Sequence, residues 1–385
     1  MRMEERKALN ADVLHYIFGA ASMHRWNDHL RTIDLTELDK QAHKAAISWI
    51  LGKAEEDAGR VIDWDRVISG NLYSFIARLA LTDLKPQLYH RISTEKTEQV
   101  NEYVLEDFIS NVPGAPERFM RGLEDYLRSD KTSAEDGISR AAHYLATRWE
   151  FRTIYPANRE MYGIEQTREE IDQQINQHMG LAGVGMLTEG GDIADMADLI
   201  GQLRFQKRWA RTPRVPQTTV LGHSLLVAVM MYLSDTDIGA GTRQKYLDYH
   251  TALFHDLPEV LTKDVITPVK ANVDGLPALL ESYERESVES RIMPLIPEGW
   301  RDELRSMVYE PFSDLPGRPE SGRRGGDIKA CDRLAAFMEA HISTRYGISS
   351  KTLRDGEREI RSVLENGSDG IGAEALLRSF DRMDI

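Results

Sequence analysis

Two imidazoles and two carboxylates in the second half of the chain have the residue types of a divalent-metal site. They are His223, the adjacent pair His255 and Asp256, and Asp332. Nitrogen and oxygen donors of this kind suit Mn, Fe, Co, Ni or Zn, and no thiolate is needed. One such residue alone would more often be structural, but all four lie where burial requires a compensating partner. The sequence therefore predicts one divalent-metal site.

The elements that carry these residues must converge from separate parts of the chain. Neighbouring residues on a helix point about 100° apart, so His255 and Asp256 can reach one ion only from a crevice between their directions. His223 precedes the wholly apolar segment 224–233, and Asp332 lies within 329–342. Both segments are typical of helices, so we expect the remaining ligands to come from other helices.

The fold class that the hydrophobic patterning predicts is all-α. Helical periodicity also covers 140–151, 246–257 and 352–364, whereas alternating β patterns are few. Glycine and proline gather at 180–191, 235–242 and 311–326, which we interpret as loops or linkers. The glycine-rich segment 180–191 follows no strand and lacks a Lys-Ser/Thr ending. It is therefore interpreted as a flexible linker rather than a phosphate-binding loop.

A weak internal duplication organises the chain. Residues 11–26 align with 194–209 without a gap, sharing an opening Ala-Asp, a central Ile and a closing Arg-Trp. Later landmarks follow in the same order, pairing His43 with His223, Thr82-Asp83 with His255-Asp256, and His143 with Asp332. Chance similarity between amphipathic helices is the alternative. The order of the landmarks favours two tandem helical domains, 1–165 and 193–385, joined by a linker at 166–192.

The pattern His, His-Asp, Asp resembles the HD-superfamily metal-dependent phosphohydrolases, whose motif is H…HD…D. The resemblance is closer to the bacterial 5′-deoxynucleotidases. It rests on Arg-Trp at 208–209, GHSLLVA at 222–228, HDLPEVLTKDVITPVK at 255–270 and KACDRLAA around Asp332, and it covers about 190–350. It implies hydrolysis of a nucleotide phosphate ester with the four residues above as metal ligands.

The same resemblance implies roles for further residues. Glu259 corresponds to the catalytic acid, and Asp264 to a position in the catalytic and substrate-contacting set. A carboxylic acid near the metal could protonate the leaving sugar oxygen if a dry site raised its pKa. An ordinary surface glutamate is the alternative for Glu259. The substrate contacts that the resemblance implies are Arg208, Trp209, His223, Asp264, Thr267 and Asp332.

The first half departs from the motif at its chemical positions. Thr82 replaces the first residue of the His-Asp pair, His143 replaces the final aspartate, and Pro86 and Arg91 stand where Glu259 and Asp264 stand. We therefore expect a degenerate, catalytically inactive copy, although Arg25-Trp26 could still hold a nucleotide. The set His43, Asp83 and His143 would still permit weak metal binding.

Three functions remain open from the sequence. The first is a 5′-nucleotidase that removes phosphate from deoxynucleoside monophosphates. The second is another HD reaction, either a deoxynucleoside triphosphate triphosphohydrolase or a guanosine tetraphosphate-type hydrolase, which the basic residues Arg323, Arg324 and Lys329 would favour. The third is a non-enzymatic nucleotide-binding regulator, against which the complete motif of the second half argues.

The composition of the chain limits the kinds of molecule it is expected to bind. The chain has 385 residues and a formal net charge of −14, which disfavours polymeric nucleic acid but leaves room for a small nucleotide. The single cysteine, Cys331, fits a reducing compartment. The longest apolar stretch, 225–233, is about half of the ~18 residues that indicate a membrane span. We expect a cytoplasmic protein whose halves form an internal pseudo-dimer, with homo-oligomers left open.

Overall fold

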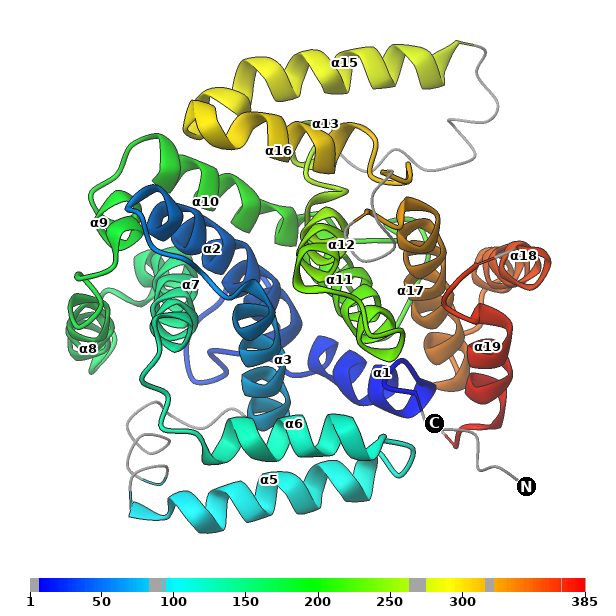
Figure 1. The fold of residues 1–385 in the computed structure, drawn as a ribbon, viewed down its shortest axis with the longest axis horizontal. Coiled ribbons are helices and arrows are strands. Elements are labelled where there is room, and N and C mark those ends of the chain that lie inside the picture. Colours follow the sequence, from blue (N-terminus) through cyan, green and yellow to red (C-terminus); the bar gives the residue numbers. More distant parts are fainter. Residues whose placement is uncertain are drawn as a thin grey trace.

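The computed structural model describes residues 7–82, 92, 95–262, 275–315, 322–367 and 369–384. Over these residues the fold is all-α, as the sequence predicts (Figure 1). The β pairing within this part of the chain is limited to two isolated antiparallel bridges, His24 with Thr36 and Lys207 with Thr219. None of the helices described here is long and apolar enough to cross a membrane.

The helices fall into three groups along the chain. The first half contains α1 (Ala11–Phe18), α2 (Glu37–Asp57), α3 (Trp64–Leu81), α5 (Thr97–Asn111), α6 (Glu117–Arg128) and α7 (Ala134–Asn158). The middle contains α8 (Ile164–Asn176), α9 (Ala182–Thr188) and α10 (Asp192–Gln202). The second half contains α11 (Val220–Asp237), α12 (Thr242–Phe254), α13 (Glu259–Thr262), α15 (Leu276–Arg291), α16 (Glu298–Tyr309), α17 (Gly325–Arg345), α18 (Lys351–Asn366) and α19 (Ala373–Arg382).

The helices predicted from hydrophobic patterning are confirmed. The apolar segment 224–233 lies inside α11, 329–342 inside α17, 140–151 inside α7 and 352–364 inside α18. The remaining segment, 246–257, is helical only to Phe254, because α12 ends immediately before the His-Asp pair. The His-Asp pair therefore begins at the C-cap of α12, where His255 still has helical backbone angles.

The flexible linker predicted at 180–191 is wrong. The predicted linker 166–192 contains most of α8 and all of α9, and α9 lies against α2. The approach is close at Gly183, where an added Cβ would lie 3.0 Å from Leu51 and 3.1 Å from the Cβ of Ala54. Gly183 therefore permits the close packing of α9 on α2, because a larger residue there would push the two helices apart.

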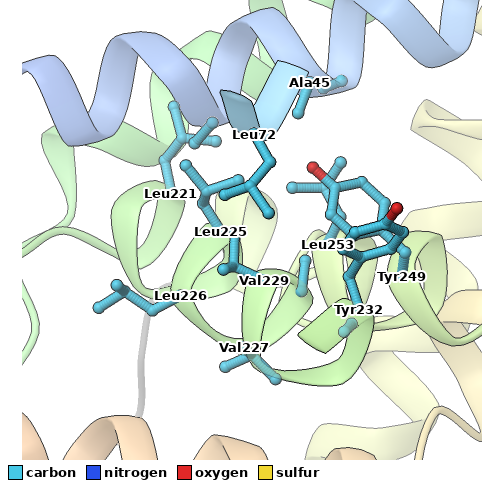
Figure 2. Close-up of a cluster of buried hydrophobic side chains, with 14 of the residues drawn as sticks. Ala45, Leu72, Leu221, Leu225, Leu226, Val227, Val229, Tyr232, Tyr249 and Leu253 are labelled. Carbon is cyan, nitrogen blue, oxygen red and sulfur yellow. The ribbon is translucent and has the colours of Figure 1, made fainter. Parts of the chain in front are cut away.

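The hydrophobic core is continuous across the predicted domain boundary. One cluster of buried apolar residues contains members from both halves. Figure 2 shows part of it, with Ala45 of α2 and Leu72 of α3 beside Leu221, Leu225 and Leu253 of α11 and α12. Helix α11 is buried on all sides because α2, α12 and α17 all pack around it (Figure 1). The two halves thus share one core, whatever their origin.

Candidate metal centre

Helix α11 begins at a Thr cap and brings His223 into the interior on its first turn. The hydroxyl of Thr219 accepts a hydrogen bond from the backbone N–H of Gly222 at 3.1 Å, which satisfies one of the free amides of the helix start. His223 is fully buried, with Nε2 lying 3.0 Å from Asp332 Oδ1. Its other nitrogen, Nδ1, lies 3.4 Å from Glu339 Oε1. Both carboxylates belong to α17.

Helix α17 presents these two carboxylates to one face. Asp332 and Glu339 are seven residues apart, which is about two helical turns, so their side chains point the same way. Lys329, one turn earlier, donates to Asp332 Oδ2 at 2.7 Å. Burial alone would raise the pKa of Asp332, but the hydrogen bond with His223 and the charge of Lys329 hold that pKa well below its usual range.

The His255-Asp256 pair lies where α12 stops. His255 Nδ1 lies 2.7 Å from the carbonyl of Ala252, a contact that orients the ring. Its Nε2 faces Asp256, whose Oδ2 is 3.2 Å away. Burial would raise the pKa of Asp256, but His255 and Arg208 lower it, so the carboxylate is charged at neutral pH.

Three of the four predicted ligands form one donor group. Single ligand atoms from His223, His255 and Asp256 all lie within 4.8 Å of one another, and among the described residues no other group meets this criterion. Asp332 adjoins the group, with Oδ1 3.0 Å from His223 Nε2 and 4.0 Å from His255 Nε2. His255 Nε2 and Asp256 Oδ2 are buried and have no hydrogen-bond partner in the described part of the chain. These donors fit a divalent first-row metal ion, because nitrogen and oxygen ligand atoms lie within 4.8 Å of one another and two of them are buried without a hydrogen-bond partner.

The Arg208-Trp209 pair lies beside this donor group. Arg208 Nη1 is 3.7 Å from Asp256 Oδ2, and Nε is 3.9 Å from Glu339 Oε2. Within the described residues the guanidinium makes these two ion pairs and no hydrogen bond. Trp209 has a φ of 56° and donates its ring N–H to Glu339 at 2.9 Å. The N–H is thus occupied by the protein, and only the ring surface can meet a substrate.

Glu339 is a site residue that sequence reasoning missed. It is fully buried and joins the ring N–H of Trp209, the hydroxyl of Thr218 at 2.5 Å, and His223. Burial would raise its pKa, but the charges of Arg214, His223 and Arg208 hold the pKa far below its usual range. A lone carboxylate inside the apolar run AAFMEAHI, two turns after Asp332, was the available signal.

The remaining predicted site residues have uneven support in the structure. Glu259 opens α13, and its backbone carbonyl accepts a hydrogen bond from Gln206 at 2.7 Å. Its charge also raises the pKa of Arg208, together with the larger contributions of Glu339 and Asp256 that outweigh burial. Asp264 and Thr267 lie outside the described residues.

In the first half, the histidine predicted as the counterpart of His223 has a different environment. His43 is buried, with Nε2 2.9 Å from the carbonyl of Ala197 and Nδ1 3.3 Å from Arg204 Nη2. It therefore faces α10 and the segment after it, with both ring nitrogens engaged. Asp83, the predicted carboxylate of a weak metal set, lies outside the described residues. The pairing of His43 with His223 is not what the local geometry favours.

Lys40 instead holds the position equivalent to His223. Thr36 caps α2 as Thr219 caps α11, each accepting from the amide three residues later. Four residues after the cap stand Lys40 in one helix and His223 in the other. The ammonium of Lys40 contacts the ring of His143, as His223 contacts Asp332. Counted from the caps, His223 thus pairs with Lys40, which stands three residues before the His43 that the sequence comparison pairs with it.

Comparison with known proteins agrees with this geometry. Residues 200–351 match a family model described as HD domain. Three curated relatives are each described as a 5′-deoxynucleotidase. The one from Shewanella oneidensis is 23% identical, over 43% of this chain and 82% of the relative. The one from Vibrio cholerae is 24% identical, over 36% of this chain and 70% of the relative, and the one from Klebsiella pneumoniae is 25% identical, over 42% of this chain and 78% of the relative. A crystal structure of an HD-domain phosphohydrolase from Listeria innocua aligns with 48% of this chain and 86% of that one, at 19% identity and a TM-score of 0.40.

Residues 200–351 of this chain therefore match an HD domain. Together with the curated relatives, this match supports an HD-superfamily phosphohydrolase. HD domains of this kind depend on a divalent metal, and the donor group formed by His223, His255 and Asp256 fits one.

Proposed function

We propose that the second half is a metal-dependent 5′-nucleotidase acting on deoxynucleoside monophosphates. The observation that carries the proposal is the convergence of His223, His255 and Asp256 within 4.8 Å in an HD domain, with Asp332 beside them. The curated relatives described as 5′-deoxynucleotidases support the choice of substrate.

The metal would be held by His223, His255, Asp256 and Asp332. When bound, a divalent ion polarises a phosphate oxygen and lowers the pKa of a water molecule. Glu339 orients one ligand, because it lies 3.4 Å from His223 Nδ1 and so leaves Nε2 directed at the donor group. The carbonyl of Ala252 orients His255 in the same way.

Substrate contacts would come from Arg208, Trp209 and Glu259. Arg208 makes no hydrogen bond within the described residues, so its planar set of N–H donors is available for phosphate oxygens. Trp209 offers its ring surface to the nucleoside. Glu259, three residues beyond Asp256, is proposed to protonate the leaving sugar oxygen, and Asp264 and Thr267 to complete the substrate contacts.

The basic residues that would favour a triphosphate substrate are occupied elsewhere. Arg323 donates to the carbonyls of Ser306, Ser313 and Glu310, and so fastens the segment before α17. Arg324 pairs with Asp235 at 2.8 Å and with Asp327. Of the three candidates only Lys329 lies at the site. This distribution of charge favours a monophosphate.

We also propose that the halves are related by duplication and form an internal pseudo-dimer. Trp26 and Trp209 both have a φ of 56°. In each half, the residue two positions before the tryptophan pairs with a Thr cap twelve positions further along the chain. The pairing buries α2 against α11, a surface that a single-domain relative would have to cover with a second copy. Light scattering at micromolar concentration is expected to give a monomer. An obligate dimer formed through the equivalent surface would contradict this arrangement.

The test of the activity uses purified protein with Mn or Co. Deoxynucleoside mono- and triphosphates are offered separately, and products are separated by ion exchange. Phosphate release from monophosphates is expected, with loss of that release in Asp256→Asn. No metal-dependent phosphate from any monophosphate would refute the proposal, and the appearance of tripolyphosphate would favour the triphosphohydrolase instead.

A further inference from the structure

The segment that leads into the metal centre is anchored in the first half by a buried arginine. Arg204 lies just after α10, four residues before Arg208, and its side chain is completely buried. Its Nη1 is 3.2 Å from Glu150 Oε1, and its Nη2 is 3.3 Å from His43 Nδ1. Its guanidinium also lies over the ring of Trp149, 4.4 Å from the ring centroid. All three partners belong to α2 and α7 of the first half.

Helix α10 approaches the first half closely enough to require a glycine. An added Cβ at Gly201 would lie 2.7 Å from Trp149 Cε2 and 2.9 Å from His43 Cε1. Both rings are also bonded to α10, since Trp149 donates its ring N–H to Asp198 at 2.8 Å and His43 Nε2 lies 2.9 Å from a backbone carbonyl of this helix. Helix α10 lies alongside α2 (Figure 1), so this packing fixes where Arg204 enters the first half.

Glu150, which receives Arg204, is the counterpart of Glu339 in the second half. Glu150 Oε2 accepts from the ring N–H of Trp26 and from Arg25 Nε, both at 2.9 Å, while Oε1 faces Arg204. The contacts of Glu339 described above all come from its own half. The glutamate of the first half therefore takes one of its partners from the segment that leads to the site of the second half.

The chain between Arg204 and Arg208 is paired with the start of α11. The carbonyl of Gln206 accepts from the backbone N–H of Val220 at 2.9 Å, and the N–H of Arg208 donates to the carbonyl of Thr218 at 3.0 Å. Four residues span at most about 14 Å even when fully extended. A displacement of Arg204 would therefore be passed on to Arg208.

We propose that Arg204 is a positioning residue for Arg208, and that through it the first half supports the substrate site of the second half. The inference rests on the proposed function, in which Arg208 binds the phosphate group. Arg204 and Glu150 are both completely buried, so water cannot readily replace either partner of this ion pair. Without the pair, Arg208 would shift from its place 3.7 Å from Asp256 Oδ2, and a misplacement of about 1 Å can cost up to about 100-fold in rate.

The test measures substrate binding and metal content separately. In Arg204→Gln, the KM for dAMP with Mn is expected to rise about tenfold, with kcat within about twofold and metal per chain unchanged. Arg152→Gln is the matched control, because Arg152 also joins α7 to α10, through Asp198 at 3.5 Å, but is 64% exposed. Its KM should equal that of the wild type. An unchanged KM in Arg204→Gln, or an equal rise in the control, would overturn the proposal.

Further variants separate positioning from a general loss of packing. Arg204→Lys keeps the charge but not the planar set of donors, so its KM should lie between those of the wild type and Arg204→Gln. Glu150→Gln should raise the KM at least as much as Arg204→Gln, and the double variant should have the KM of Glu150→Gln alone, because both changes act through one contact. Independent effects in the double variant would overturn the proposal. Circular dichroism checks folding, and if Arg204→Gln does not fold, Arg204→Lys and Glu150→Gln provide the same comparison.

Binding of inorganic phosphate distinguishes this proposal from the nucleotidase assignment. Isothermal titration of the Mn-loaded protein with millimolar phosphate should show about tenfold weaker binding in Arg204→Gln, at equal Mn per chain. Phosphate binding that weakens in this variant, in a protein that does not hydrolyse dAMP, would refute the nucleotidase and support the positioning role. Equal phosphate affinity in the two proteins, or no phosphate binding by the wild type, would overturn the positioning role.

Discussion

The two halves build similar frameworks around opposite charges. Around Trp26 and Trp209 the frameworks agree: both residues have a φ of 56°, and both donate the ring N–H to a buried glutamate at 2.9 Å, Glu150 in one half and Glu339 in the other. The groups at the centre differ, because one half places Lys40 beside His143 where the other places His223 beside Asp332. The two helical frameworks are thus similar while the groups at their centres differ in chemistry.

The comparison also separates the residues that hold the shared framework from the residues at the centre, which differ between the halves. Glu150 of α7 and Glu339 of α17 each hold the Arg-Trp segment of their own half against the helix that carries the glutamate. The central pairs differ, with Lys40 beside His143 in one half and His223 beside Asp332 in the other. The framework can therefore be tested separately from the site.

The largest expected effect comes from the metal ligands. His223→Ala removes one imidazole, and Asp256→Asn is a nearly isosteric second variant. Both should lose the bound metal entirely and reduce phosphate release by about 10³-fold or more, since a metal ion contributes several kcal/mol to charge stabilisation. Lys40→Met should keep the metal content of the wild type. Metal per chain is measured by mass spectrometry, and a remaining equivalent in His223→Ala would mean that the first half also binds metal.

The next largest effect is on metal affinity, and it distinguishes Glu339 from Glu150. Glu339→Gln weakens the orientation of His223 and should lower metal affinity by about 10–100-fold, the usual cost of losing such a partner. Glu150→Gln removes the matching group in the first half and should leave metal affinity unchanged. Competition with a fluorescent chelator gives both affinities. Equal losses in the two variants would show that the effect is a general loss of packing.

The two threonine caps, Thr36 and Thr219, are expected to differ in how much they contribute to stability. Thr36→Ala should lower the free energy of unfolding by about 1 kcal/mol, as for an ordinary cap. Thr219→Ala should lower it by about 1–3 kcal/mol more, because its hydroxyl also donates to the buried Asp39, which would then lack this partner. Urea unfolding measures both. The same loss for the two variants would argue against Asp39 as a strong link between the halves.

The smallest expected effect is an increase in the free energy of unfolding. Lys44→Met should raise the free energy of unfolding by about 1 kcal/mol near pH 7, since replacing an uncompensated buried charge with an apolar side chain is often stabilising. The pKa of Lys44 is about 7 in the folded chain and higher when unfolded, so the unfolded state binds more protons between pH 7 and 10. Wild-type stability should therefore rise with pH in that range, and less steeply in the variant. A slope that is unchanged in Lys44→Met would contradict the burial of this charge.

The helices of the second half and the grouping of three candidate ligands could be predicted, since they depend on local patterns. Hydrophobic periodicity located α7, α11, α17 and α18, and the spacing of His223, His255, Asp256 and Asp332 gave a ligand set of which three members lie in one donor group. The segment 180–191 was misinterpreted because glycine signals both flexibility and close helix packing. Only the contact between α9 and α2 distinguishes these two roles.

The sequence by itself determined an all-α chain with an HD-type ligand set in its second half and chemically altered positions in its first. The tertiary structure decided that both halves share one core, that Glu339 lies beside His223 Nδ1, and that Lys40 contacts His143 in the first half. Lys40 meets a partner 103 residues away, and Thr218 meets Glu339 across 121. Contacts at such separations leave no periodic trace in the sequence, because they arise only when distant helices pack together.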